Sequence, residues 1–312
     1  FSFANAYAPL DFGARRYCEA RVWSYFNMFT ARGNEFLPYI LGDTDTPMPL
    51  FVKPDRKISV QDVKNAMRDH YEGTPLDISK DFGAGPYHTP YRLSPLSFKV
   101  GDKEYFNERP ISTQQSGFVF VAQMRSTLPD AIGGVLWFGT DDANMTVFTP
   151  VYCCTDKVPV CYSRVDGADY ITFSWNSSFW IFNWVSNMVY PRYDLMIDDV
   201  RATQNELETT FNEAQEGIES AAAKLLEKDP AKAKAFLTNY TNMTAQSAFD
   251  TWKRLGEFII VKYNDGVVRK MKDGKFERNA IGQPAGVVRP GYPKEFLEEY
   301  VKQTGDRYKM PD

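Results

Sequence analysis

The sequence predicts an α+β protein with a mainly antiparallel sheet, followed by a long helical hairpin and a small C-terminal strand and helix unit. Two observations carry this prediction. Between residues 117 and 154, β-branched and aromatic runs alternate with turn signals, which is typical of strands joined by short turns. After residue 198, apolar residues recur at spacings of three and four, which is typical of long amphipathic helices.

Two helices are expected before the strands. Apolar and small side chains recur at helical spacing over residues 12–29, which predicts an amphipathic helix. Ser59, with Asp62 three residues later, matches a capping box and predicts a short helix that ends near residue 73. Residues 80–98 are rich in Gly, Pro and Tyr. They predict a long ordered loop, because aromatic side chains at that density favour burial.

Three apolar runs form the core of the expected sheet: "GFVFVAQM", "GGVLWFGT" and "MTVFTPVYCC". A further run, "ADYITFSW" at residues 168–175, predicts a fourth strand. Some of these runs are apolar on both faces, so we expect helices or loops on both sides of the sheet.

The second half of the chain is predicted to be mainly helical. "SSFWIFNWVSNMVY", residues 177–190, is apolar nearly all round and predicts a buried helix. A long helix is expected beyond Asp198, and Asp229 with Pro230 begins a second one that runs to about Leu255. The two helices should form an antiparallel hairpin. "EFIIVKYNDGVVRK" then predicts a strand with an Asp-Gly turn, and "YPKEFLEEYVKQTG" a closing helix.

Composition excludes several classes of protein. The chain has 312 residues, 43% of them hydrophobic, which is enough for a sizeable core. Its net charge of −4, with acidic and basic residues intermixed, argues against nucleic acid or anionic membranes as partners. No apolar stretch reaches the roughly 20 residues of a membrane-spanning helix. The chain opens at Phe1 without an initiating Met, so we expect its natural N-terminus to lie upstream.

The four cysteines and two histidines do not form a metal-binding pattern. No Cys-x-x-Cys spacing occurs, so neither a structural zinc ion nor any other cofactor is expected. A disulfide from Cys153 or Cys154 to Cys161 is sterically feasible, but small buried thiols are the favoured interpretation.

No complete catalytic set emerges from residue spacing. A catalytic Ser/His/Asp set would need His70 as its base, but the sequence contains no Gly-x-Ser-x-Gly elbow for the serine. We therefore interpret His70 as a histidine near a helix end that hydrogen-bonds to backbone carbonyls. The carboxylate pairs Asp141 with Asp142 and Asp198 with Asp199 could serve acid–base chemistry. They fall at an expected turn and helix start, where acidic residues are common, so a structural role is favoured.

Four stretches of the chain together resemble one known family. They are "FSFANAYAPLDFGARRYCEARVWSYF", "MRDHYEGTPLDIS", "RPISTQQSGFVFVAQMRSTLPDAIGGVLWFGTDDAN" and "SFWIFNWVSN". In this order they are similar to the C-terminal portion of the cysteine dipeptidases of the N-terminal-nucleophile (Ntn) hydrolase superfamily, relatives of penicillin V acylase. The resemblance spans residues 1–200 and is weaker in the helical tail.

The resemblance implies a fold and a reaction. The fold would be part of a four-layer αββα Ntn-hydrolase sandwich, with a core portion at residues 1–190 and a hairpin and cap at residues 191–312. The reaction would be dipeptide hydrolysis by a cysteine that becomes the first residue and uses its own α-amine as base, which needs no histidine. Cys18 lies inside an expected helix. We therefore expect the nucleophile in a segment upstream of Phe1, and we expect this chain alone to be inactive.

The resemblance also suggests which residues contact the substrate. Arg109 is a candidate for a bidentate contact with a substrate carboxylate. The other candidates are Thr113, Gln114, Gln115, Ser116 and Asn183. Alternate strand residues point oppositely, so at most half of the cluster at residues 113–116 should face one pocket. Each candidate also has a structural alternative. Arg109 could be a surface arginine, residues 113–116 could be the hydrogen-bonded start of a strand, and Asn183 could be a buried amide with satisfied hydrogen bonds.

Two other functions remain open from the sequence. One is a non-catalytic ligand- or protein-binding module that keeps the fold, and the other is a secreted structural domain held by its cysteines. For the dipeptidase hypothesis, the expected partners are a dipeptide substrate and the nucleophile-bearing segment of the same protein, with no nucleic acid. The sequence leaves homo-oligomerisation and the cellular compartment open.

Overall fold

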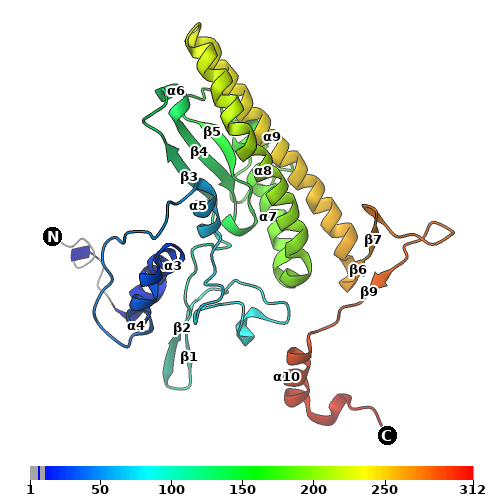
Figure 1. Ribbon diagram of the computed structural model, residues 1–312. Helices are drawn as coiled ribbons and strands as arrows, with labels where there is room; N and C mark the ends of the chain where they lie inside the picture. The colour runs from blue at the N-terminus through cyan, green and yellow to red at the C-terminus, as the bar shows by residue number, and fades with distance from the viewer. Residues whose placement is uncertain (1–5, 8–10, 312) are drawn as a thin grey trace.

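The structure of the chain, a computed structural model, describes residues 6–7 and 11–311 (Figure 1). Its centre is a three-stranded antiparallel sheet made of β3 (Phe118–Met124), β4 (Gly134–Thr140) and β5 (Thr149–Tyr152), in that order. The three strands are those predicted from the apolar runs. Together with the surrounding helices they confirm the α+β class.

The helix predicted over residues 12–29 is confirmed, although it is not uniform. Its elements and those that follow are α2 (Phe12–Ala14), a π-helical turn (Arg15–Glu19), α3 (Ala20–Phe29), a 3-10 turn (Ala31–Phe36) and α4 (Leu37–Leu41). Trp23 of α3 packs with Tyr71 and Ile78 in a small second core beside the main one.

The capping box predicted at Ser59 is present. The Ser59 hydroxyl accepts a hydrogen bond from the backbone N–H of Asp62 at 3.1 Å, and the Asp62 carboxylate accepts from the backbone N–H of Ser59 at 2.8 Å. The helix that follows, α5 (Val60–Ala66), ends earlier than expected. It cannot extend to residue 73, because Tyr71 adopts a left-handed backbone conformation with φ 66°.

Residues 80–98 form the expected long loop, which contains one 3-10 turn at Phe82–Ala84. Its end already belongs to β1 (Ser97–Val100), which pairs antiparallel with β2 (Lys103–Phe106). The sequence analysis missed this hairpin. Both strands are largely exposed and carry several charged side chains, so they lack the apolar pattern by which the other strands were predicted.

The predicted apolar helix is α7 (Ser178–Val189), whose inward side chains are fully buried. The fourth strand predicted at residues 168–175 is wrong. This segment makes one isolated bridge, between Asp169 and Thr172, and Ile171 is 94% exposed. A strand needs a neighbouring strand to bond its backbone, and none of the described residues supplies one here.

The predicted antiparallel hairpin is formed by α8 (Tyr193–Leu226) and α9 (Pro230–Tyr263), which lie along the sheet (Figure 1). Asp229 caps α9 as predicted. Its carboxylate accepts hydrogen bonds from the backbone N–H groups of Ala231 and Lys232 at 3.0 and 3.2 Å.

The strand predicted after Leu255 is wrong, because α9 continues through residues 257–263. Leu255, Ile259 and Tyr263 are all buried, and their spacing of four keeps them on one face of the helix. The β-branched residues of this segment favour a strand by propensity alone. Burial of a continuous helical face outweighs that preference here.

One face of the sheet is buried and the other is open. Val121 and Trp137 point into the core that α5, α8 and α9 cover, whereas Phe118 and Phe120 are 57% and 49% exposed on the opposite face. This alternation follows from strand geometry. The expected cover is therefore complete on one face only; on the other, the described residues cover part of the sheet, where Tyr162 packs edge-on against Phe138.

The core continues across the predicted domain boundary. Phe182 of α7 stacks on Trp252 of α9, with ring centroids 4.7 Å apart. Both rings belong to the main core cluster. The division into residues 1–190 and residues 191–312 stays a prediction.

The C-terminal unit contains the predicted closing helix, α10 (Lys294–Thr304). Its strands are β6 (Val268–Arg269) paired with β9 (Val287–Val288), and β7 (Met271–Lys272) paired with β8 (Lys275–Phe276). The remaining short elements are α6 (Asp130–Gly133) and 3-10 turns at Ala143–Met145, Val160–Tyr162, Val165–Gly167, Tyr190–Arg192, Asn264–Gly266 and Gly305–Tyr308. In the described part of the chain, no helix is both long and apolar enough to cross a bilayer.

Candidate functional site

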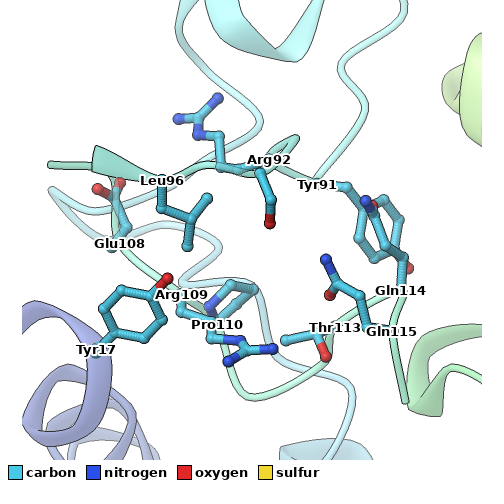
Figure 2. Close-up of a pocket in the computed structure, with 11 residues that line it drawn as sticks. Tyr17, Tyr91, Arg92, Leu96, Glu108, Arg109, Pro110, Thr113, Gln114 and Gln115 are labelled. Atoms are coloured by element: carbon cyan, nitrogen blue, oxygen red, sulfur yellow. The ribbon is translucent and has the colours of Figure 1, made fainter. Parts of the chain in front are cut away.

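A small pocket opens where three separate parts of the chain meet (Figure 2). Its cavity measures about 90 Å³, several times the roughly 10–15 Å³ that one water molecule needs. The first helical segment, the loop before β1 and the loop between β2 and β3 contribute Tyr17, Tyr91, Arg92, Ser94, Leu96 and residues 108–110 and 113–115. A cavity of this size can hold one polar end group of a small ligand.

Four of the six residues predicted to bind substrate line this pocket: Arg109, Thr113, Gln114 and Gln115. The other two do not. The Ser116 hydroxyl lies 3.3 Å from that of Thr113, and Asn183, on α7, donates its amide to the Asp141 carboxylate at 2.8 Å. The structure thus brings four candidates together, leaves Ser116 beside Thr113 just outside the lining, and separates Asn183 from them, while the binding role of each stays a prediction.

Residues 112–116 form a turn ahead of β3 and not the start of the strand. The backbone N–H of Ser116 donates to the carbonyl of Thr113 at 3.1 Å, which closes the turn. Alternation of side chains therefore does not apply, and the consecutive residues Thr113, Gln114 and Gln115 all line one pocket. The expectation that at most half of this cluster would do so is wrong.

Arg109 carries a positive charge without a carboxylate partner among the described residues. The carbon at the centre of its guanidinium lies 5.7 Å from the ring centroid of Tyr17. The other arginine of the pocket, Arg92, pairs with Asp81, and Figure 2 shows its guanidinium pointing away from the cavity. An unpaired, half-buried guanidinium favours binding of an anion, because guanidinium groups form paired hydrogen bonds with carboxylates.

Buried hydrogen bonds support the pocket from behind. The Tyr71 hydroxyl donates to the backbone carbonyl of Arg109 at 2.6 Å, and the Tyr91 hydroxyl donates to the Asp142 carboxylate. Burial raises the pKa of both phenols well above the usual range, so both remain protonated donors at neutral pH. Sequence reasoning missed Tyr91. The density of aromatics before β1 predicted burial, but no spacing distinguishes the one that meets the pocket.

None of the four cysteines lines the pocket. Cys18 and Cys153 are exposed, and burial raises the pKa of the Cys161 thiol to about 12 and also raises the pKa of Cys154. All four thiols are free, so the alternative disulfide to Cys161 is not formed. The expectation of small buried thiols holds for Cys161 and is wrong for Cys153, and Cys154 is only partly buried. A thiol with a raised pKa is a poor nucleophile at neutral pH, because little of it is thiolate.

The histidine and carboxylate pairs weighed as catalytic groups also lie outside the pocket lining. His70 is fully buried, and its Nδ1 lies 3.0 Å from Glu72 Oε1, a carboxylate in place of the expected helix-end carbonyls. Asp141 and Asp142 are buried after β4, and Asp199 belongs to the contacts within the helical hairpin. Across residues 6–7 and 11–311, no group of His, Cys, Asp or Glu side chains is arranged to hold a metal ion.

Comparisons with known protein sequences show which family this chain is similar to. The chain is 31% identical over 152 residues to a probable dipeptidase of Salmonella dublin, covering 49% of the chain and 29% of that protein. It is 26% identical over 248 residues to probable dipeptidase B of Lactococcus lactis subsp. lactis (strain IL1403), covering 76% of the chain and 45% of that protein. Dipeptidase A of Lactobacillus helveticus is 26% identical over 137 residues, covering 44% of the chain and 24% of that protein.

Each of these matches covers less than half of the relative's own length. The family profile of peptidase family C69 matches residues 1–206, which is more than half of the chain and includes every residue of the pocket. The chain therefore belongs to peptidase family C69.

Proposed function

We propose that this chain is part of a cysteine dipeptidase of the Ntn-hydrolase type, and that it supplies one wall of the substrate pocket while a preceding segment supplies the nucleophilic cysteine. The observation that carries the proposal is the unpaired Arg109 guanidinium in a pocket lined by further polar donors. Membership of family C69 and the dipeptidase names of the similar proteins support hydrolysis of dipeptides.

Arg109 would bind the carboxylate at the C-terminal end of the dipeptide. A guanidinium binds a carboxylate through two parallel hydrogen bonds, which fixes both the position and the orientation of the substrate. Gln114 and Gln115 line the same cavity and make no side-chain hydrogen bond to another described residue, so their amides can contact the rest of the substrate. A dipeptide has a free carboxylate on the residue after its peptide bond, whereas a peptide bond inside a longer chain does not.

The proposed nucleophile lies outside these residues. A cysteine at a chain terminus can use its own α-amine as the base, so the reaction needs no histidine. The thiolate attacks the peptide carbonyl, hydrogen-bond donors stabilise the negatively charged tetrahedral oxygen, and the C-terminal amino acid leaves as an amine. Water then hydrolyses the resulting thioester and releases the N-terminal amino acid. None of the four thiols lies in the pocket lining, which supports a nucleophile outside these residues.

The open face of the sheet also supports a further segment. Phe118 and Phe138 line an aromatic groove of about 440 Å³ together with Phe179 and Trp180, and Ile171 stands beside it 94% exposed. Apolar surface of this extent is unfavourable in contact with water. We propose that the preceding segment covers it, which would complete the sandwich of two sheets between helical layers.

Covalent labelling tests the location of the nucleophile. The full-length protein is treated with a dipeptide that carries a thiol-reactive group, and the labelled residue is identified by peptide mapping. We expect one label, on a cysteine upstream of Phe1, and turnover should survive Cys18→Ser and Cys161→Ser. A label on any of the four cysteines described here, with loss of turnover on its replacement, would overturn the proposal.

A further inference from the structure

Two consecutive buried aspartates follow β4, and their side chains serve different parts of the protein. The Asp141 carboxylate accepts hydrogen bonds from the Asn183 amide at 2.8 Å and the Ser186 hydroxyl at 2.7 Å, both on α7. Asp141 has a left-handed backbone conformation with φ 68°. This conformation turns the chain sharply, so that the next carboxylate, that of Asp142, faces the pocket loops instead.

Asp142 is fully buried and surrounded by hydrogen-bond donors. The Ser112 hydroxyl donates to its Oδ1 at 2.5 Å, and the backbone N–H of Asn144 donates to the same oxygen at 3.1 Å. The hydroxyls of Tyr91 and Tyr190 donate to Oδ2, the latter at 3.4 Å. A carboxylate can accept from all of these groups, whereas an asparagine amide would place its own N–H groups against at least one donor.

Two of these donors belong to the two different loops that line the pocket. Tyr91 lines the cavity itself, at the start of the wall that includes Arg92 and Leu96. Ser112 directly precedes Thr113 on the other loop. In Figure 2, Leu96 lies across the cavity from Pro110 and Thr113, and Tyr91 lies beside Gln114. One buried carboxylate therefore connects the two loops that form the pocket.

We propose that Asp142 is a positioning residue that holds the two pocket walls at the separation needed to bind the dipeptide, acting through Tyr91 and Ser112 without touching the substrate. This inference rests on the proposed function of the pocket. It differs from a purely stabilising role in its consequence. Loosening the walls should weaken substrate binding more than it slows the chemical step, so KM should rise while kcat stays nearly constant.

Removing one donor at a time tests the inference in the full-length protein. Tyr91→Phe and Ser112→Ala each delete one hydroxyl and leave the carboxylate in place. Tyr152→Phe is the matched control, because the Tyr152 hydroxyl is also buried and donates to a carboxylate, that of Glu219, at 3.1 Å. Tyr152 pairs with Val135, at the end of the sheet away from the pocket loops.

We expect Tyr91→Phe and Ser112→Ala to raise the KM for a dipeptide about five- to tenfold with kcat changed less than twofold, as the loss of one hydrogen bond predicts. Tyr152→Phe should leave KM unchanged, even if its melting temperature falls as far as those of Tyr91→Phe and Ser112→Ala. Asp142→Asn should exceed either single change. If Asp142→Asn does not fold, the two hydroxyl deletions decide the question alone.

Arg109→Ala separates this inference from the function on which it rests. If Arg109→Ala raises KM but Tyr91→Phe and Ser112→Ala leave it unchanged, as Tyr152→Phe should, the positioning role of Asp142 is refuted. The pocket then remains the proposed substrate site. If Arg109→Ala also leaves KM unchanged, the pocket is not the substrate site and both proposals are overturned.

Discussion

The hydroxyl of Tyr71 donates a hydrogen bond of 2.6 Å to the backbone carbonyl of Arg109, 38 residues further along the chain. Tyr71 is fully buried, and its ring stacks on Trp23 of α3 with centroids 6.4 Å apart. The side chain proposed to bind the substrate carboxylate thus projects from backbone that the small N-terminal core holds in place. This contact is one of the links between the packing of α3 and the geometry of the pocket.

Tyr71→Phe removes that contact and keeps the ring. A buried carbonyl loses its donor, so the free energy of unfolding should fall by about 1 kcal/mol and KM should rise about threefold. Urea denaturation and steady-state kinetics measure the two effects. Tyr240→Phe is a suitable comparison, because the buried Tyr240 hydroxyl has no hydrogen-bond partner among the described residues. Equal effects of both substitutions on KM would show that the Tyr71 contact does not support the pocket.

Arg109→Ala should reduce the preference for a free C-terminal carboxylate. The relevant measurement compares kcat/KM for a dipeptide with that for the same dipeptide amide. Loss of a charged, paired contact costs about 2 kcal/mol, which corresponds to a roughly thirtyfold loss on the dipeptide and little change on the amide. Arg109→Lys keeps the charge but not the paired geometry, so its kcat/KM for the dipeptide should lie between those of the unmodified protein and Arg109→Ala. An unchanged ratio in Arg109→Ala would exclude the carboxylate contact.

Lys64 should make stability depend on pH. Its side chain is fully buried, with Nζ 3.5 Å from the centroid of the Trp137 ring, and burial lowers its pKa from 10.5 to about 7. Between these two values the unfolded chain binds a proton that the folded chain does not, so stability rises with pH. The rise between pH 7 and pH 9 should be roughly 2 kcal/mol.

Lys64→Met isolates this contribution, since methionine is unbranched and of similar length but carries no charge. Urea denaturation at pH 7, 8 and 9 should show the rise in the unmodified protein and a much flatter profile in the variant. The difference between the two profiles isolates Lys64 together with its electrostatic interaction with Glu208 and Arg68. Parallel profiles would show that the pKa of Lys64 is not lowered in the folded state.

Asp229 should stabilise the helical hairpin through its cap. Asp229→Ala removes the acceptor for the backbone N–H groups of Ala231 and Lys232 and should cost about 1 kcal/mol of unfolding free energy. Asp229→Asn keeps a good capping oxygen, so its cost should be much smaller. Thermal or urea unfolding distinguishes the two, and equal losses in both variants would point to the charge of Asp229 instead of its cap.

The sequence alone predicted an element correctly where local chemistry and tertiary packing favour the same structure. The capping box at Ser59, the cap at Asp229 and the apolar helix over residues 178–189 were all predictable, because each has a local signature that tertiary contacts do not contradict. The strand predicted at residues 257–263 failed for the opposite reason. There, packing of Ile259 and Tyr263 against the core outweighs a local preference for strand.

The pocket could be predicted only in part. Crowded polar residues before an apolar strand indicated the wall at residues 113–115, but not Tyr17, which comes from nearly a hundred residues earlier. The buried role of Asp142 was equally out of reach, because its partners Tyr91 and Ser112 lie 51 and 30 residues away along the chain. Contacts between residues so far apart in the chain depend on the whole fold, and they produce no local sequence pattern from which they could be predicted.

Dipeptide turnover by residues 1–312 alone, compared with that of the full-length protein, tests the central claim most directly. If this chain supplies the pocket and a preceding segment supplies the thiol, the isolated chain should show no turnover and the full-length protein should hydrolyse dipeptides. Turnover by the isolated chain that is abolished by Cys18→Ala would contradict the account and would place the nucleophile on the first helical segment.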